Sequence, residues 1–205
     1  MRAAILVIGL MTLAGVPAFW PGSMSPAVGA ADNHHDPDSA EYDVYAAVIA
    51  RRIVNAGVKK IVIAKNTVKP GTFDRQIEES RETFMNNVSA DLSRETVEDY
   101  IDKGRGSRQI ELRSMPGVEF VLLDQSIIAT FFQRGPDGWT DLKAKYPGIG
   151  GIFTFSRVGF NHEMNQALVY AGWSCGPLCG HGDFFFLEKH AGAWTIKKQY
   201  SLWIS

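Results

Sequence analysis

Two cysteines stand four residues apart near the end of the chain, in the run Ser174-Cys175-Gly176-Pro177-Leu178-Cys179-Gly180-His181-Gly182. They are the only cysteines in the sequence, and the glycines and proline around them predict a turn. A disulfide is the usual state of such a pair in an exported protein. We therefore expect a disulfide between Cys175 and Cys179. Because the ring is short, the chain-entropy relation gives this bond only about 2 kcal/mol of stabilisation.

Two other kinds of chemistry are open to this loop. A redox pair of the thioredoxin type is spaced Cys-x-x-Cys at the N-terminus of a helix, whereas the residues after Cys179 are expected to enter a strand. A metal could bind both thiolates and His181, with His190 or His162 as a fourth ligand, a set that suits zinc or Cu(I). We favour the structural disulfide and predict no metal and no cofactor. A thiol- or metal-dependent enzyme centred on Cys175, Cys179 and His181 is the alternative.

Four polar residues in the same region are candidates for ligand binding. Arg157 and Asn161 flank an expected turn between two strands, His162 follows them, and His181 stands in the cysteine loop. A buried Arg or Asn at a turn usually bonds backbone carbonyls. The functional alternative is that these side chains face the cysteine loop and bind an anionic or polar ligand.

Familiar catalytic motifs do not explain the chain. The run Gly172-Trp173-Ser174-Cys175-Gly176 matches the Gly-x-Ser-x-Gly pattern of serine hydrolases, but that motif needs a strand, a sharp turn and a helix. Here a loop and a strand follow, so we interpret the match as chance. His162-Glu163 lacks the second histidine of a zinc-protease helix. No catalytic residue is predicted, and whether the protein is an enzyme stays open.

The last fifty residues alternate between apolar and polar side chains. Four strands are expected, at residues 152–158, 166–173, 183–189 and 193–204, separated by Gly- or Asn-rich turns. In the last of them, one face is expected to hold Trp194, Ile196, Tyr200, Leu202 and Ile204. That pattern predicts a sheet with one side on a core and the other in water. Core positions are also expected for Trp173, Trp194 and Trp203.

This region resembles a family of small exported bacterial α+β proteins with a Cys-Gly-x-Leu-Cys-Gly-x-Gly loop in a C-terminal β-meander. The resemblance rests on the runs Phe155-Ser156-Arg157-Val158-Gly159-Phe160-Asn161, Gln166-Ala167-Leu168-Val169-Tyr170 and Leu187-Glu188-Lys189, on the cysteine loop, and on Trp194 and Trp203. It implies that the meander with its loop is a recurring module. The family has no established activity, so no substrate is implied. An N-terminal helix with a terminal meander is also loosely similar to cone-shaped folds of the nuclear-transport-factor type.

The earlier part of the chain is expected to be largely helical. Helices are predicted at residues 39–56, 76–88 and 139–146, with a further short helix capped by Ser93. Strands are predicted at residues 58–64 and 118–123, and a weaker one at 110–112. Helices come first and the meander last, which predicts the α+β class. We expect N-terminal helices packed on a mainly antiparallel sheet that ends in a four-stranded C-terminal meander.

The N-terminus has the pattern of a secretory signal. Arg2 precedes an apolar run at residues 3–14, and small residues follow up to Ala31. We expect a signal peptide over residues 1–30, cleaved after Ala30 or Ala31, then a flexible lead-in at 31–38 and a single domain at 39–205. The expected location is the periplasm or the medium, with no stable membrane span after cleavage.

The charge balance limits the class of partner. The chain has 21 basic and 22 acidic residues and a net charge of -1. Proteins that bind by neutralising phosphates carry a basic stripe, whereas the lysines here come singly or in pairs, so nucleic acid is not expected. The predicted function is that of a disulfide-stapled binding or structural module, whose partner is an unknown small molecule or protein.

Overall fold

The computed structural model describes residues 37–53, 57–68, 91–115, 117–133 and 137–205. They belong to the compact unit His35–Ser205, one of two units in the chain, the other being Met1–His34. The predicted signal peptide, the lead-in as far as residue 36 and the helix predicted at 76–88 lie outside the described residues. None of the described helices has the length and apolar character needed to cross a bilayer.

Seven described strands form one mixed sheet in the order β2-β1-β3-β5-β6-β7, with the short β4 also paired to β5. Their bounds are β1 Lys60–Ala64, β2 Glu119–Leu123, β3 Ile149–Phe155, β4 Gly159–Phe160, β5 Gln166–Gly176, β6 Cys179–His190 and β7 Ala193–Ile204. β1 is parallel to β2 and β3, and every later pairing is antiparallel. The predicted α+β class with a C-terminal meander is confirmed.

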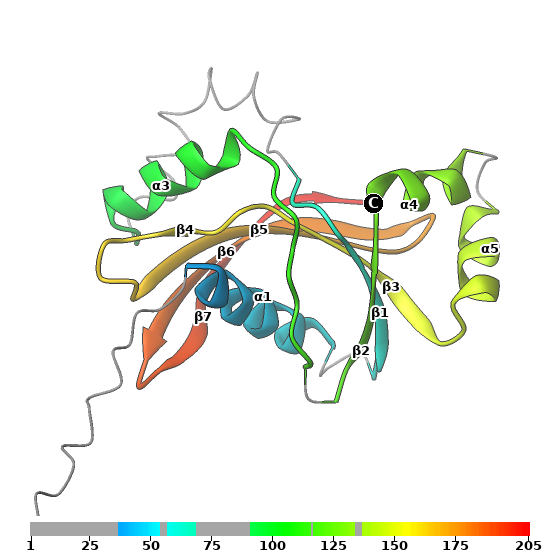
Figure 1. The fold of residues 1–205 in the computed structure, drawn as a ribbon, viewed down its shortest axis with the longest axis horizontal. Coiled ribbons are helices and arrows are strands. Elements are labelled where there is room, and N and C mark those ends of the chain that lie inside the picture. The colour runs from blue at the N-terminus through cyan, green and yellow to red at the C-terminus, as the bar shows by residue number, and fades with distance from the viewer. Residues whose placement is uncertain (1–36, 54–56, 69–90, 116, 134–136) are drawn as a thin grey trace, which may run out of the picture. The chain divides into compact units, whose positions relative to one another are not determined.

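Helices lie on both faces of the sheet (Figure 1). α1 (Pro37–Ile53) covers one face, and its apolar stripe at Val44, Val48 and Ile49 is fully buried there. α3 (Arg94–Gly104) packs on the opposite face against β4 and β5. α3 begins as predicted at Ser93, whose hydroxyl accepts a hydrogen bond from the Thr96 backbone N–H (3.3 Å).

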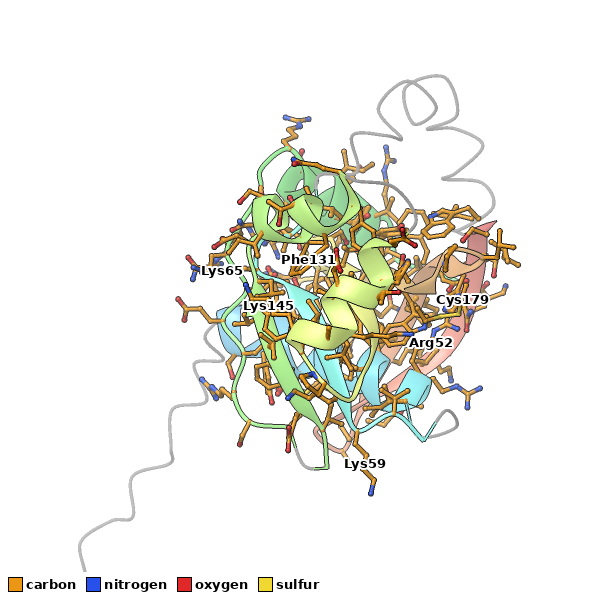
Figure 2. All side chains as sticks on the ribbon, turned by 90° about the vertical axis from the view of Figure 1, so that its right-hand side faces the viewer. Arg52, Lys59, Lys65, Phe131, Lys145 and Cys179 are labelled. Carbon is orange, nitrogen blue, oxygen red and sulfur yellow. A yellow bond between two sulfur atoms is a disulfide. The ribbon has the colours of Figure 1, made fainter. Side chains whose placement is uncertain are left out.

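A second pair of helices continues the α3 side of the sheet. α4 (Gln125–Phe132) and α5 (Gly138–Lys145) contact each other and cover β1, β2 and β3 on that face. Lys145 Nζ lies 6.0 Å from the centre of the Phe131 ring (Figure 2), which joins the two helices. α5 confirms the helix predicted at 139–146, whereas α4 had no counterpart among the predicted elements. No strand forms at residues 110–112, where the Ile110 N–H instead donates to Lys65 O (2.7 Å).

β5 and β6 are buried on both faces. Val169 and Phe185 pack on the α1 side, Leu168 and Phe184 pack on the α3 side, and all four are at most 1% exposed. The expectation that one side of the meander meets water is therefore wrong for these two strands. The continuous apolar run of β6 that begins at Phe184 is typical of a strand covered on both sides.

β7 changes face part-way along its length. The ladder between β6 and β7 has two register shifts, which make Lys197 and Leu202 extra residues in β7. As a result Trp194 and Ile196 pack with the α1-side core, whereas Tyr200 packs with the α3-side core. The predicted single face along this strand is therefore wrong.

The tryptophans are less buried than predicted. Trp173 and Trp194 are partly buried against the α1-side core. Trp203 is 38% exposed, and its Nε1–H donates to the Tyr170 hydroxyl (3.0 Å). The predicted core position is therefore wrong for Trp203.

The two-sided core gives a direct test on stability. Phe185→Ala should lower the free energy of unfolding by about 3 to 5 kcal/mol, because it empties a fully buried position under α1. Leu178→Ala, at a residue that is 88% exposed, should change it by less than about 0.5 kcal/mol. Urea unfolding followed by circular dichroism measures both. Equal effects would mean that β6 is not part of the core.

Candidate functional site

The cysteine loop is the tip of the hairpin between β5 and β6. Cys175 lies at the end of β5, Cys179 begins β6, and their sulfurs are bonded to each other; Cys179 is labelled in Figure 2. The predicted disulfide is therefore present. Among the described residues, no three His, Cys, Asp or Glu side chains form a group that could hold a metal ion. Ser174 lies within β5, so the Gly-x-Ser-x-Gly match has no helix after it.

His181 belongs to a buried polar cluster on the α1 face of the sheet. Its Nε2 lies 4.0 Å from Asp183 Oδ2 and has no hydrogen-bond partner, although the atom is buried. The Asp183 carboxylate is 1% exposed; it forms an ion pair with Arg52, from the last turn of α1, and accepts a hydrogen bond from Ser201 Oγ (2.7 Å). Burial, together with the Arg52 charge, lowers the pKa of His181, and the Asp183 charge opposes this shift.

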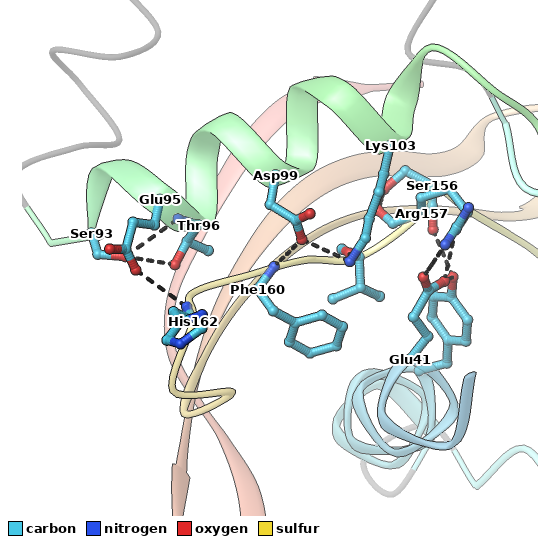
Figure 3. Close-up of polar contacts among 12 residues, drawn as sticks. Glu41, Ser93, Glu95, Thr96, Asp99, Lys103, Ser156, Arg157, Phe160 and His162 are labelled. Atoms are coloured by element: carbon cyan, nitrogen blue, oxygen red, sulfur yellow. Dashed lines mark hydrogen bonds and ion pairs between the residues drawn. The ribbon is translucent and has the colours of Figure 1, made fainter. Parts of the chain in front are cut away.

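Arg157 reaches α1 near its other end. Its guanidinium donates from Nη2 to Glu41 Oε1 (2.7 Å) and from Nε to both carboxylate oxygens (2.9 and 3.1 Å), as Figure 3 shows. The Tyr45 hydroxyl lies 2.9 Å from both Glu41 Oε2 and the Ser156 carbonyl, and it can donate its single hydrogen to either. Burial and the adjacent Glu41 charge raise the pKa of Tyr45 well above its ordinary value. Arg157 therefore fixes α1 to the segment that follows β3.

A cavity of about 20 Å³ lies beside this ion pair. It is lined by Glu41, Tyr42, Tyr45, Thr67, Arg108, Gln109, Ile110 and Glu111. Its walls are polar, but a space of this size holds roughly one water molecule. It is too small for a substrate.

Asn161 and His162 form the turn between β4 and β5. Asn161 Oδ1 accepts from the backbone N–H groups of Asn165 (3.0 Å) and Gln166 (2.8 Å), and Asn161 Nδ2 donates to Asn165 Oδ1 (2.7 Å). The His162 backbone N–H donates to Glu95 Oε2 in α3 (3.2 Å). Asn161 therefore holds the turn, but its side chain accepts from backbone N–H groups rather than bonding the backbone carbonyls that the sequence suggested.

α3 is fixed to β4 by residues that the sequence did not point out. Asp99 Oδ2 accepts from the Phe160 backbone N–H (2.7 Å) and from Lys103 Nζ (2.7 Å), and Lys103 also donates to Val158 O (3.2 Å), as Figure 3 shows. Asp99 and Lys103 stand at the i,i+4 spacing of a helical ion pair. That spacing was visible in the sequence, but their bonds to β4 were not.

Three surface clefts on the described residues are much wider than the cavity beside Glu41. One, of about 650 Å³, runs between α3 and the turn after β4 and is lined by Glu95, Glu98, Asp99, Asp102, Lys103, Phe160, Asn161, His162 and Met164. A second, of about 550 Å³, shares Glu95, Asn161 and His162 with the first. A third, of about 540 Å³, lies between α1 and β7. In the first cleft the acidic side chains already have partners: Glu98 pairs with Arg94, and Asp102 pairs with Arg105.

The four predicted ligand residues do not share one set of contacts. Asn161 and His162 lie together at the α3 cleft. Arg157 contacts Glu41 under α1, and His181 contacts Asp183 near the cysteine loop. The structure therefore brings together only the two that are neighbours in the sequence. No family model, no curated protein and no solved structure matches this chain.

The buried ion pair at Arg157 can be tested against an exposed pair of the same chemistry. Arg157→Ala should lower the free energy of unfolding by about 3 to 5 kcal/mol, because it leaves the Glu41 carboxylate buried without its partner. Arg94→Ala removes an exposed i,i+4 pair with Glu98 and should cost less than about 0.5 kcal/mol. Chemical denaturation compares the two variants. A cost for Arg157→Ala no larger than that for Arg94→Ala would contradict a structural role.

His181 should make the fold sensitive to mild acid. Its pKa in the folded chain lies below the ordinary value of 6.5, so the unfolded chain binds more protons between those two values and stability falls as the pH drops through that range. Arg52 and Asp183 are the charged groups that face it. His181→Gln should flatten the dependence of unfolding free energy on pH between about pH 7.5 and 5.5. An unchanged slope in the variant would assign the effect to other histidines.

Proposed function

We propose that this chain is an exported binding module, stapled at a hairpin tip by the Cys175–Cys179 disulfide, that takes up its partner on an open surface. The proposal rests on the form of the openings among the described residues. The cavity beside Glu41 holds about 20 Å³, whereas the clefts on α3 and between α1 and β7 hold about 650 and 540 Å³. Small-molecule sites usually offer a concave space of about 300 to 1,000 Å³ that covers most of the ligand. The wider clefts reach that volume, but they are open surface hollows that would leave much of a small ligand in solvent. Such hollows suit a partner that is itself a surface or a peptide.

Export is the second part of the proposal. A disulfide persists in oxidising compartments and is rare in the cytosol, and the Cys175–Cys179 bond is formed here. The signal-like pattern of residues 1–30 supports the same location. We place the protein in the periplasm or outside the cell.

The polar candidates support a binding module better than an enzyme. The two sulfurs are bonded to each other, Arg157 is used by Glu41, and Asn161 by its own turn. The alternative is a thiol- or metal-dependent enzyme centred on Cys175, Cys179 and His181. It stays a prediction from the sequence, because none of the contacts described for these three residues favours it.

Thiol and metal measurements on protein recovered from the exported compartment test the proposal. We expect no thiol to react under native or denaturing conditions, and a metal content far below stoichiometric. A variant with both Cys175→Ser and Cys179→Ser gives the baseline for each assay. A reactive thiol of low pKa, or stoichiometric metal that the double variant loses, would overturn the binding-module proposal in favour of the enzyme.

A further inference from the structure

A cleft of about 540 Å³ separates α1 from the last strand of the sheet. Its lining residues come from one side of α1 and from the first half of β7: Ala47, Ala50, Arg51, Trp194, Thr195, Ile196, Lys197, Lys198 and Gln199. On the helix side, Ala47 and Ala50 carry the smallest side chains with a Cβ, so the helix leaves room beside the strand. On the strand side, Trp194 and Ile196 are only partly buried.

β7 is an edge of the sheet. It pairs with β6 on one side, and no described strand lies beyond it on the other. In an antiparallel strand every second residue turns its N–H and C=O away from its neighbour. β7 spans 12 residues, with register shifts at Lys197 and Leu202. Among the described residues no strand pairs with its outer donors and acceptors, so this side is a template for another strand.

Basic side chains flank this edge on both faces of the sheet. Arg51 is exposed on the α1 side, and among the described residues no carboxylate lies within ion-pair distance of it. Lys198 lies opposite Phe186 and therefore on the α3 face. Lys197 and Lys198 each contact one carboxylate, those of Glu188 and Asp91. None of the nine lining residues is acidic.

We propose that β7 and α1 bind an acidic, extended segment of a partner protein by strand addition. The backbone of the segment pairs with the open edge of β7, and its side chains alternate between the two faces. On one face they meet Arg51 and the space over Ala47 and Ala50, and on the other they meet Lys197 and Lys198. This inference rests on the proposed binding function and names the site and the class of partner.

Charge argues for an acidic partner over a second copy of this chain. Two β7 strands paired edge to edge would bring two sets of Lys197, Lys198 and Arg51 together. Like charges on neighbouring strands destabilise a pairing, and edge lysines commonly prevent self-association. Arg51, which pairs with no carboxylate among the described residues, favours a segment that carries carboxylates.

Peptide binding to the full chain tests this site. The probe is a short fluorescent peptide that alternates Glu and Val, with a Lys/Val peptide and a Glu/Val peptide N-methylated at alternate amides as comparisons, all measured by fluorescence anisotropy. The Glu/Val peptide should bind at least about tenfold more tightly than the Lys/Val peptide. N-methylation should remove binding, because it blocks the backbone hydrogen bonds to β7.

Two charge-reversal variants test whether the peptide binds at this cleft. Arg51→Glu should weaken binding of the Glu/Val peptide by about tenfold or more, whereas Arg105→Glu, at an exposed arginine in the loop after α3, should leave it unchanged. Both arginines are exposed, so both variants should fold, and circular dichroism checks this.

Other outcomes would overturn the inference in distinct ways. Equal binding of the Lys/Val peptide would refute acidic recognition, and undiminished binding of the N-methylated peptide, or no binding at all, would refute strand addition. A dimer in sedimentation velocity that Arg51→Glu alters would identify a second copy as the occupant. The binding-module proposal is tested separately by the thiol and metal measurements, and none of these peptide results alters that test.

Discussion

Burial of β5 and β6 on both faces is the constraint that the rest of the fold satisfies. Consecutive residues such as Phe184 and Phe185 point to opposite sides of the sheet, and both are buried. An aromatic side chain carries about 150 to 250 Å² of surface, so neither face can be left in water. α1 covers one face and α3 the other, from distant parts of the chain.

Apolar contacts are not directional, so they alone would not fix where α1 and α3 lie along the sheet. Buried polar groups fix these positions. Glu41 near the start of α1 pairs with Arg157, and Arg52 in its last turn pairs with Asp183. On the other face Asp99 of α3 accepts from the Phe160 backbone N–H. A buried ion pair adds little net stability because both charges lose their hydration, but its geometry specifies one arrangement. Arg157, which the sequence suggests as a ligand-binding residue, is used here to place a helix.

Local sequence signals predicted most helices and strands, but they could not predict contacts between residues far apart in the chain. Ser93, glycine turns and period-two runs located α3 and the meander, because caps and turns depend on near neighbours. The apolar run at Phe184 could have indicated two-sided burial, but the bulge at Lys197 has no local signature. Arg157 and Glu41 are 116 residues apart, so no spacing rule pairs them. For the same reason the sequence grouped Asn161 and His162 with Arg157 and His181 in one predicted ligand site, and could not show that these residues lie in different places on the sheet.

The anchoring of α1 also decides what the edge of the sheet can do. Glu41 and Arg52 hold the helix at both ends, and Ala47 and Ala50 lie between these two anchors. The distance between α1 and β7 is therefore set by buried contacts rather than by the cleft residues themselves. A strand that adds to β7 meets an edge whose backbone and flanking helix are already in place, so little ordering of the protein opposes its binding. The same two ion pairs that hold α1 over the core therefore also fix the position of this helix beside the edge strand β7.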